Sequence, residues 1–542
     1  MRYDFVIIGA GSAGGILATR LSQDPARSVL LLEAGPDYPD LEQLPDELKY
    51  GYETGGEEPS LRTPGGHPIA LANSKHNWQY VAKATDKAPP LPVPRGKVTG
   101  GSSAINFSAF FRGIPEDFDS WALMGNDEWD FEKVLPYFRK LETDVDQHGD
   151  YHGSEGPIIV HHASKENWPP AQVAFYNACR AAGFADCVDH NSPGSTGVGP
   201  SITNNHNRVR FSTALGYLSQ SRHRLNLTIK SNCSAHKITF EGKKATGVLV
   251  ESAGEYFAVE GEQIILSAGA IGSPQLLMLS GIGPADHLSE LGIQVVQDLP
   301  GVGSHLKDHP KVYTTWRISV EYLSNPKKAQ RGVALRCSAP GSHLPNDLNI
   351  TLGAFVSPRA NPLASQETTQ DEDVSADQRI EMMIALLLPK SSGSLRLASA
   401  NPSVQPQLDY NYLDEPFDRD RLREGVRLAL GLAEHKDLKP LIGERVEPDG
   451  KDLVSDEALD DWMMRSATTY SHISGTCKMG PSSDPMAVVD QRGKVRGIDH
   501  LRVIDASIMP DLVRAAINPT VLMMAERLSD VIMDMRPCKI RR

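Results

Sequence analysis

Cysteine is scarce in this sequence, and its spacing excludes the common metal-binding frameworks. The 542 residues include six cysteines, at positions 179, 187, 233, 337, 477 and 538. None of them belongs to a Cys-x-x-Cys pair, and no spacing matches a structural zinc site. We therefore expect reduced thiols, as in a cytoplasmic protein, and no bound metal.

Long apolar runs and an excess of positive charge are also missing. The strongest apolar run, Met382–Leu388, is far too short to cross a bilayer. Residues 1–15 lack the charged and apolar regions of a secretion signal. A net charge of −13 disfavours contact with nucleic acid or anionic lipid. These absences predict a cytoplasmic protein with no membrane span and no nucleic-acid partner.

Three segments carry the alternation of strand, turn and helix that builds a parallel sheet. Residues 3–35 have the pattern of a buried strand, a helix and a second buried strand. Strand-to-helix patterns recur at 262–283 and at 501–535. Because these segments come from both ends and the middle of the chain, we expect them to form one sheet. Residues 311–470 mix strands with a long helix and predict a second domain.

A glycine motif lies between the first predicted strand and the first predicted helix. Gly9, Gly11 and Gly14 form Gly-x-Gly-x-x-Gly. Gly9 permits a tight turn, Gly11 lets backbone N–H groups approach a pyrophosphate, and Gly14 lets helix and strand pack closely. Glu33 ends the second strand, where a carboxylate can accept the ribose hydroxyls of an adenosine. The motif predicts dinucleotide binding; the alternative is a glycine-rich turn with no ligand.

A second glycine-rich stretch favours FAD over NAD. Residues 94–113 contain the pair Gly100 and Gly101, followed by Ser102 and Asn106. The backbone of such a stretch can run along the phosphate, ribityl and ring of a flavin and donate N–H groups to it. An NAD enzyme must instead release its cofactor and admit a second substrate, whereas FAD needs a second anchoring region at its flavin end.

Five blocks of sequence, in order, resemble the glucose–methanol–choline (GMC) family of FAD-dependent oxidoreductases. They are GAGSAG with Glu33, RGKVTGGSSAIN, LSAGAIGSPQLLMLSGIGP, PGVGSHLKDHP, and SHISGTCKMG followed by LRVIDASIMP. The resemblance covers nearly the whole chain and looks nearest to the choline dehydrogenase and hydroxymethylfurfural oxidase branch. It implies an α/β fold, α+β overall, in which a doubly wound FAD-binding domain lies beside a substrate domain of antiparallel sheet and helices.

The same resemblance divides the chain between the two implied domains. The FAD-binding domain takes residues 1–155, 206–310 and 466–542, and the last of these segments carries the active site. The substrate domain takes residues 156–205 and 311–465. No oligomeric state is predicted.

The resemblance also implies a set of FAD-binding residues. The block around Gly100 would pass the reactive edge of the flavin, and the helix that opens near Pro519 would point its positive end at the flavin pyrimidine. Some relatives attach FAD covalently through a histidine at the place of Ile105, so we expect noncovalent FAD here. The implied residues are Gly9, Gly11, Ser12, Ala13, Gly14, Glu33, Ala34, Trp78, Arg95, Val98, Gly100, Gly101, Ser102, Asn106, Phe107, Ser108, Ala235, Ala268, Asp505, Ala506, Pro519 and Thr520.

His472, in the block SHISGTCKMG, matches the family's catalytic base. Enzymes of the family oxidise an alcohol by removing the hydroxyl proton and passing a hydride to flavin N5. Imidazole suits the first role because its ordinary pKa of about 6.5 leaves it largely neutral at neutral pH. An isolated histidine is more often a packing residue, so the assignment depends on all five blocks. The implied substrate is a small primary or secondary alcohol, and the electrons pass to O₂ or another acceptor.

Position 516 departs from the family pattern. Relatives usually carry His or Asn there, nine residues before Ala525, but this chain has Ala516. Three interpretations follow: a bound water assists His472, Asn518 takes part of the role, or oxidation is impaired. Asn518 is therefore the second candidate catalytic residue. The third interpretation leaves open a GMC-fold flavoprotein with non-redox chemistry, such as a lyase or a photodecarboxylase, or a carrier that binds FAD without turnover.

Overall fold

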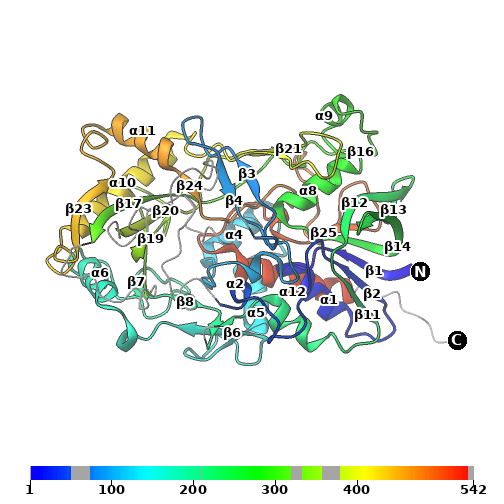
Figure 1. The fold of residues 1–542 in the computed structure, drawn as a ribbon, viewed down its shortest axis with the longest axis horizontal. Coiled ribbons are helices and arrows are strands. Elements are labelled where there is room, and N and C mark those ends of the chain that lie inside the picture. Colours follow the sequence, from blue (N-terminus) through cyan, green and yellow to red (C-terminus); the bar gives the residue numbers. More distant parts are fainter. Residues whose placement is uncertain (1, 51–73, 208, 319–331, 357–378, 535–542) are drawn as a thin grey trace.

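Strands from both ends and the middle of the chain form one seven-stranded sheet. The computed structural model describes residues 2–50, 74–207, 209–318, 332–356 and 379–534. The strand order is β11-β2-β1-β14-β13-β12, with β25 beside β14. This arrangement confirms that the three predicted segments share a sheet, which lies on the right in Figure 1. The strands are β1 (Arg2–Ile8), β2 (Val29–Leu32), β11 (Leu227–Lys230), β12 (Ser234–Glu241), β13 (Lys244–Ser252), β14 (Glu255–Leu266) and β25 (Leu501–Val503).

The first sheet is mostly parallel, and helices cover it. Strands β11, β2, β1, β14 and β25 pair in parallel, whereas β12 and β13 pair antiparallel. All four residues of β2 are buried, the continuous apolar run that a strand covered on both faces requires. Helix α1 (Ser12–Leu21) follows β1 and packs against α12 (Ile517–Asp534), and α8 (Gly269–Leu279) follows β14. The α/β fold class expected from the sequence is therefore present.

A second seven-stranded sheet is antiparallel and lies on the left in Figure 1. Its order is β23-β17-β20-β19-β18-β7, with β24 beside β17, and helices α6 (Pro170–Ala181), α10 (Pro416–Ala433) and α11 (Asp456–Ser466) lie at this end of the molecule. The domain boundaries drawn from the sequence stay a prediction. The strands are β7 (Gly197–Pro200), β17 (Pro310–Ile318), β18 (Val333–Cys337), β19 (Leu348–Val356), β20 (Arg379–Leu386), β23 (Ile442–Glu447) and β24 (Thr468–Thr469).

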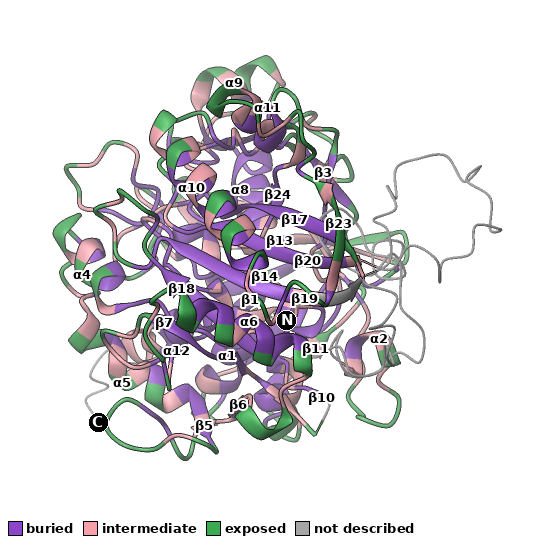
Figure 2. Ribbon diagram, turned by 90° about the vertical axis from the view of Figure 1, so that its left-hand side faces the viewer, coloured by how far each residue is buried: buried purple, intermediate pink, exposed green. Residues whose placement is uncertain are grey.

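Shorter elements connect the sheets and cover their edges. In Figure 2 the central strands are coloured as buried, whereas outer loops and the outer helix α4 carry exposed residues. No helix in the described ranges has the length and apolar character needed to cross a bilayer. The other principal elements are α2 (Asp46–Lys49), β3 (Tyr80–Ala82), β4 (Leu91–Val93), α4 (Pro115–Leu123), α5 (Phe131–Leu141), β5 (Glu142–Asp144), β6 (Ile158–His162), α7 (Thr213–Gly216), α9 (Ala285–Glu290), β21 (Ser394–Arg396) and β22 (Gln407–Asp409).

A buried ion pair ties the first helix to the last. Glu526 of α12 is fully buried and accepts from Arg20 of α1 through Nε at 2.9 Å and Nη2 at 2.7 Å. The hydroxyl of Tyr217 donates to the same carboxylate at 2.7 Å. The pair joins elements 506 residues apart in the sequence, and so closes the first domain around its two chain ends.

Replacing Glu526 with alanine should lower the stability of the folded chain by about 3 kcal/mol, because Arg20 and Tyr217 lose a buried partner. The midpoint of thermal unfolding reports this loss. The control is Glu434→Ala, which removes an exposed pair with Lys439 and should cost less than about 1 kcal/mol. Equal midpoints for the two variants would contradict the assigned importance of the pair.

Candidate active site

A long cavity of about 660 Å³ collects residues from both sheets. It is lined by the strand ends of β1 and β2, by residues 94–97 and 105–107, by the start of α8, and by residues of β18 and β19. Residues 470–473 and 514–518 line it as well. This volume lies within the range typical of cofactor and small-molecule sites.

The glycine motif has the geometry of a dinucleotide turn. Gly9 has φ +99°, and a Cβ there would lie 2.4 Å from the carbonyl oxygen of Ser267. A Cβ on Gly14 would lie 1.9 Å from the carbonyl oxygen of Gly9, so this glycine permits the close packing of helix and strand. Gly11 lines the cavity, and a Cβ there would lie 3.7 Å from Cα of Gly101. These are the three roles expected of the motif.

The second glycine stretch touches the first, backbone to backbone. Gly100 has φ +98° and donates its N–H to the carbonyl of Ala10 at 2.8 Å. A Cβ on Gly101, which has φ +51°, would lie 2.6 Å from Cα of Gly11. The two loops can therefore form one continuous backbone surface only where both lack side chains.

Glu33 directly follows β2 and lines the cavity. Its Oε2 accepts from the N–H of Ala10 and its Oε1 from the N–H of Gly35, both at 2.9 Å. Burial raises the pKa of Glu33 to about 7, although both backbone donors favour the charged form. Each carboxylate oxygen keeps a second lone pair, which suits the predicted contact with ribose hydroxyls.

Most residues expected to bind FAD line this one cavity. Those that line it are Gly9, Gly11, Ser12, Ala13, Glu33, Ala34, Trp78, Arg95, Gly101, Ser102, Asn106, Phe107, Ala235, Ala268, Asp505 and Ala506. Those that are buried but lie outside the lining are Gly14, Val98, Gly100, Ser108, Pro519 and Thr520. Gly14 and Gly100 shape the backbone instead, and the individual contacts with FAD stay predictions.

The residues present fit FAD. The backbones of Gly9, Gly11 and Gly101 form a glycine cradle. A Cβ added to Gly9 or Gly101 would clash with the neighbouring backbone. Arg95 lines the cavity, and its Nε and Nη2 have no hydrogen-bond partner among the described residues. A backbone cradle at a helix N-terminus, with an arginine in the lining of the same cavity, is the chemistry that accommodates an anionic dinucleotide.

His472 lines the same cavity and is held from two sides. Its Nδ1 lies 2.9 Å from Nδ1 of His309, and its ring centroid lies 4.5 Å from that of Tyr470. Its backbone N–H donates to Oδ1 of Asp308 at 2.7 Å. Burial lowers the pKa of His472 well below the ordinary value of 6.5, and the positive charge of Arg95 lowers it further. The imidazole is therefore held neutral.

Asp308 fixes the backbone around both histidines. Its Oδ1 also accepts from the N–H of His309 at 2.9 Å, and its Oδ2 accepts from the hydroxyls of Thr469 and Tyr412. Burial lowers the pKa of His309 to about 3, so this second imidazole is neutral too. Asp308 and His309 both belong to the block PGVGSHLKDHP. Their hydrogen bonds with His472 become visible only in the folded chain.

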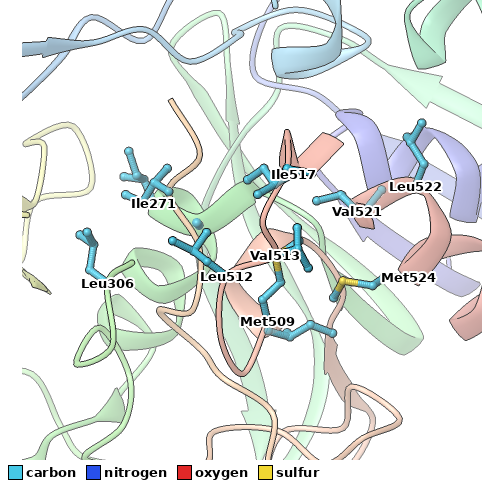
Figure 3. Packing of buried hydrophobic residues seen from close by; sticks show 14 of the residues in the cluster. Ile271, Leu306, Met509, Leu512, Val513, Ile517, Val521, Leu522 and Met524 are labelled. Carbon is cyan, nitrogen blue, oxygen red and sulfur yellow. The ribbon is translucent and has the colours of Figure 1, made fainter. Parts of the chain in front are cut away.

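Position 516 and its neighbours also face the cavity. Ala516 and Asn518 both line it, and Oδ1 of Asn518 accepts from the hydroxyl of Ser12 at 2.8 Å. Figure 3 shows Leu512 and Val513 grouped with Ile517 and with Ile271 of α8. This apolar packing positions residues 514–518 at the cavity wall. The catalytic role of Asn518 stays a prediction.

Two family models match most of the chain. Both are described as GMC oxidoreductase, and they match residues 3–311 and residues 389–525. Together these ranges contain the glycine motif, the second glycine stretch and His472.

Named relatives extend the likeness over nearly the full length. An oxygen-dependent choline dehydrogenase from Vibrio vulnificus is 35% identical, covering 99% of this chain and 95% of the relative. The solved pyridoxine 4-oxidase from Mesorbium loti has a TM-score of 0.87 at 28% identity, covering 99% of this chain and 100% of that structure. A solved formate oxidase from Aspergillus oryzae, whose FAD modification was studied, has a TM-score of 0.83 at 26% identity, with 98% of both chains covered. The chain therefore belongs to the GMC oxidoreductase family and is an FAD-dependent oxidoreductase.

Proposed function

We propose that this chain oxidises an alcohol to a carbonyl compound, with His472 as the base that removes the hydroxyl proton. FAD, when bound, supplies the acceptor for the hydride. A relative named choline dehydrogenase supports this substrate class, because choline is an alcohol. The electrons then pass to O₂ or to another acceptor.

The contact between His472 and His309 is the observation that carries the proposal. Two neutral imidazoles joined Nδ1 to Nδ1 share one proton, so one ring donates and the other accepts. If His472 donates from Nδ1, its Nε2 keeps a lone pair and can accept a proton. His309 would then carry its proton on Nε2, and the backbone of Val513 offers a hydrogen-bond acceptor to this ring. The proposal requires this pair of tautomers, because the reverse pair would place the proton of His472 on Nε2.

The missing side chain at position 516 leaves three arrangements, as the sequence implied. Oδ1 of Asn518 accepts from the hydroxyl of Ser12. The amide N–H groups of Asn518 are the atoms that would donate to a substrate oxygen in the second arrangement. Ala516 and His472 line the same cavity, and in the first arrangement a water takes the place of the missing side chain and assists His472. The relatives named above are a dehydrogenase and two oxidases, and this does not favour the non-redox alternative.

We further propose noncovalent FAD, because Ile105 lines the cavity where a linking histidine would stand.

The pH dependence of flavin reduction tests the role of His472. The neutral imidazole is the active form, and burial lowers its pKa, so the rate constant should stay high as pH falls through 6.5. The rate should fall only below the lowered pKa. Anaerobic stopped-flow mixing of the holoenzyme with a reducing alcohol, followed at the flavin absorbance band, measures this constant. An acid limb centred at pH 6.5 or above would contradict the proposal.

A further inference from the structure

One row of paired side chains crosses the second sheet, and two of its members line the cavity. Lys311 of β17 pairs with Ala385 of β20, Ala385 pairs with Asn349 of β19, and Asn349 pairs with Arg336 of β18. Residues directly opposite each other on neighbouring strands share a face of the sheet. Arg336 and Asn349 line the cavity, so this face is the one turned toward it. Lys311 and Arg336 stand at the two ends of the row, and the buried Ala385 and Lys311 lie outside the cavity lining.

Arg336 is buried without a counter-ion among the described residues. Its side chain is 1% exposed, and its Nη1 and Nη2 donate to the carbonyls of His190 at 2.8 Å and Arg514 at 2.9 Å. Its Nε has no hydrogen-bond partner in the described part of the chain. Its hydrogen bonds go only to backbone carbonyls, so no carboxylate pairs with it directly, although the charge of Asp117 favours it through space.

The carboxylate closest in this network already serves another arginine. Asp117 accepts from Nε of Arg514 at 2.7 Å and from the N–H groups of Arg514 and Ile114. Glu381 lies on the same sheet face as Arg336, but it stands opposite Thr315, four residues along the strand from Lys311, and does not line the cavity. The carboxylates that do line the cavity are Glu33, Glu251 and Asp505, all on the first sheet or at its strand ends.

A chain of contacts joins Arg336 to the proposed base. Asn349, opposite Arg336, bonds to the hydroxyl of Tyr470 at 3.0 Å, and the ring of Tyr470 lies against that of His472. The amide oxygen of Asn349 has no partner among the described residues. Rotation of this amide by half a turn lets Tyr470 donate to the oxygen and turns the NH₂ group toward a ligand.

We propose that Arg336 and Asn349 bind a carboxylate of the alcohol substrate, so that the preferred substrate is a hydroxy acid. Nη1 and Nη2 each keep a second N–H, and two such donors match the two oxygens of a carboxylate. The amide of Asn349 adds a third donor beside it. A cationic alcohol such as choline would instead meet a positive charge that no carboxylate pairs with directly. The inference rests on the proposed function, because it assigns the substrate end of the same cavity.

A substrate panel on the holoenzyme tests this preference. ω-Hydroxy acids of graded length and 4-(hydroxymethyl)benzoate are each paired with the corresponding neutral amide, and choline is added as the cation. The best acid should exceed its amide in kcat/KM by about 10–100-fold, the effect expected of a buried hydrogen-bonded charge. Arg336→Met should abolish that ratio, and Arg336→Lys should restore part of it. Amides or choline used better than every acid would overturn the proposal.

A binding measurement separates this inference from the proposed reaction. Benzoate and benzamide are titrated into the oxidised holoenzyme, and the change in the flavin spectrum is recorded. Benzoate should bind more tightly, and Arg336→Met should remove the difference. This outcome supports the anion site even if no alcohol reduces the flavin. Equal binding of the two probes to the unaltered protein overturns it even if neutral alcohols are oxidised.

The reduced flavin is the other possible source of negative charge. If Arg336 served the flavin, Arg336→Met would lower reduction by acids and amides equally and would shift the flavin potential. That result would overturn the substrate assignment. FAD content and the midpoint of thermal unfolding are measured for each variant, so a folding defect is recognised, and the benzoate titration of the unaltered protein then decides the question.

Discussion

Replacing His472 with alanine is expected to lower the rate constant of flavin reduction by about 10²–10⁴-fold while FAD stays bound. The variant loses the atom that accepts the hydroxyl proton, but none of the backbone that forms the glycine cradle. The measurement is anaerobic stopped-flow reduction at a saturating concentration of the best alcohol, with FAD content determined from the absorbance spectrum.

The matched control for this experiment is His223→Ala. His223 is exposed and stands outside the cavity lining, so its removal should leave the rate constant unchanged. Equal rates for His472→Ala and the unaltered protein would show that another group removes the proton. Loss of FAD from His472→Ala would instead assign this histidine to cofactor binding.

Replacing Gly101 with alanine is expected to abolish stoichiometric FAD binding. The new Cβ would lie 2.6 Å from Cα of Gly11, and a backbone atom cannot move aside as the end of a side chain can. The left-handed backbone of Gly101 adds about 1–3 kcal/mol of strain for any other residue. The loop carrying Gly101 would therefore separate from the first glycine turn, and the continuous surface would be lost. The FAD-to-protein ratio after purification measures this effect.

Gly183 provides a control that isolates backbone strain. It has φ +94°, but a Cβ there would have no atom within 4 Å. Gly183→Ala should lose some thermal stability and keep its FAD. If Gly101→Ala also purified with one FAD per chain, the contact between the two loops would not be needed for the cofactor.

The glycine turn was the part of the site most accessible from sequence. Gly9, Gly11 and Gly14 act through backbone geometry within one short segment, so strand, turn and helix patterns are enough to identify them. The sequence also predicted that segments from both ends and the middle of the chain build the first sheet, because each segment has its own strand-to-helix pattern. His472 required the family resemblance, since one histidine in a small-residue turn has no distinctive local pattern.

Arg336, Asn349 and His309 could not be assigned in this way. Arg336 and Asn349 meet only through the register of β18 and β19, and a shift by one residue would turn both side chains to the other face. His309 and His472 are 163 residues apart and are joined by one contact between ring nitrogens. Pairings of this kind depend on how strands that are distant in the sequence align within the second sheet, which periodicity along one segment does not encode.

Anaerobic reduction of the bound flavin by a hydroxy acid deuterated at its carbinol carbon tests the central claim most directly. The account predicts that the undeuterated acid bleaches the flavin band in a single turnover, and that deuterium at the carbinol carbon slows this bleaching. It also predicts that His472→Ala retains the yellow cofactor but is reduced far more slowly. A flavin that stays oxidised with every alcohol, acid and amide in the panel would contradict the account.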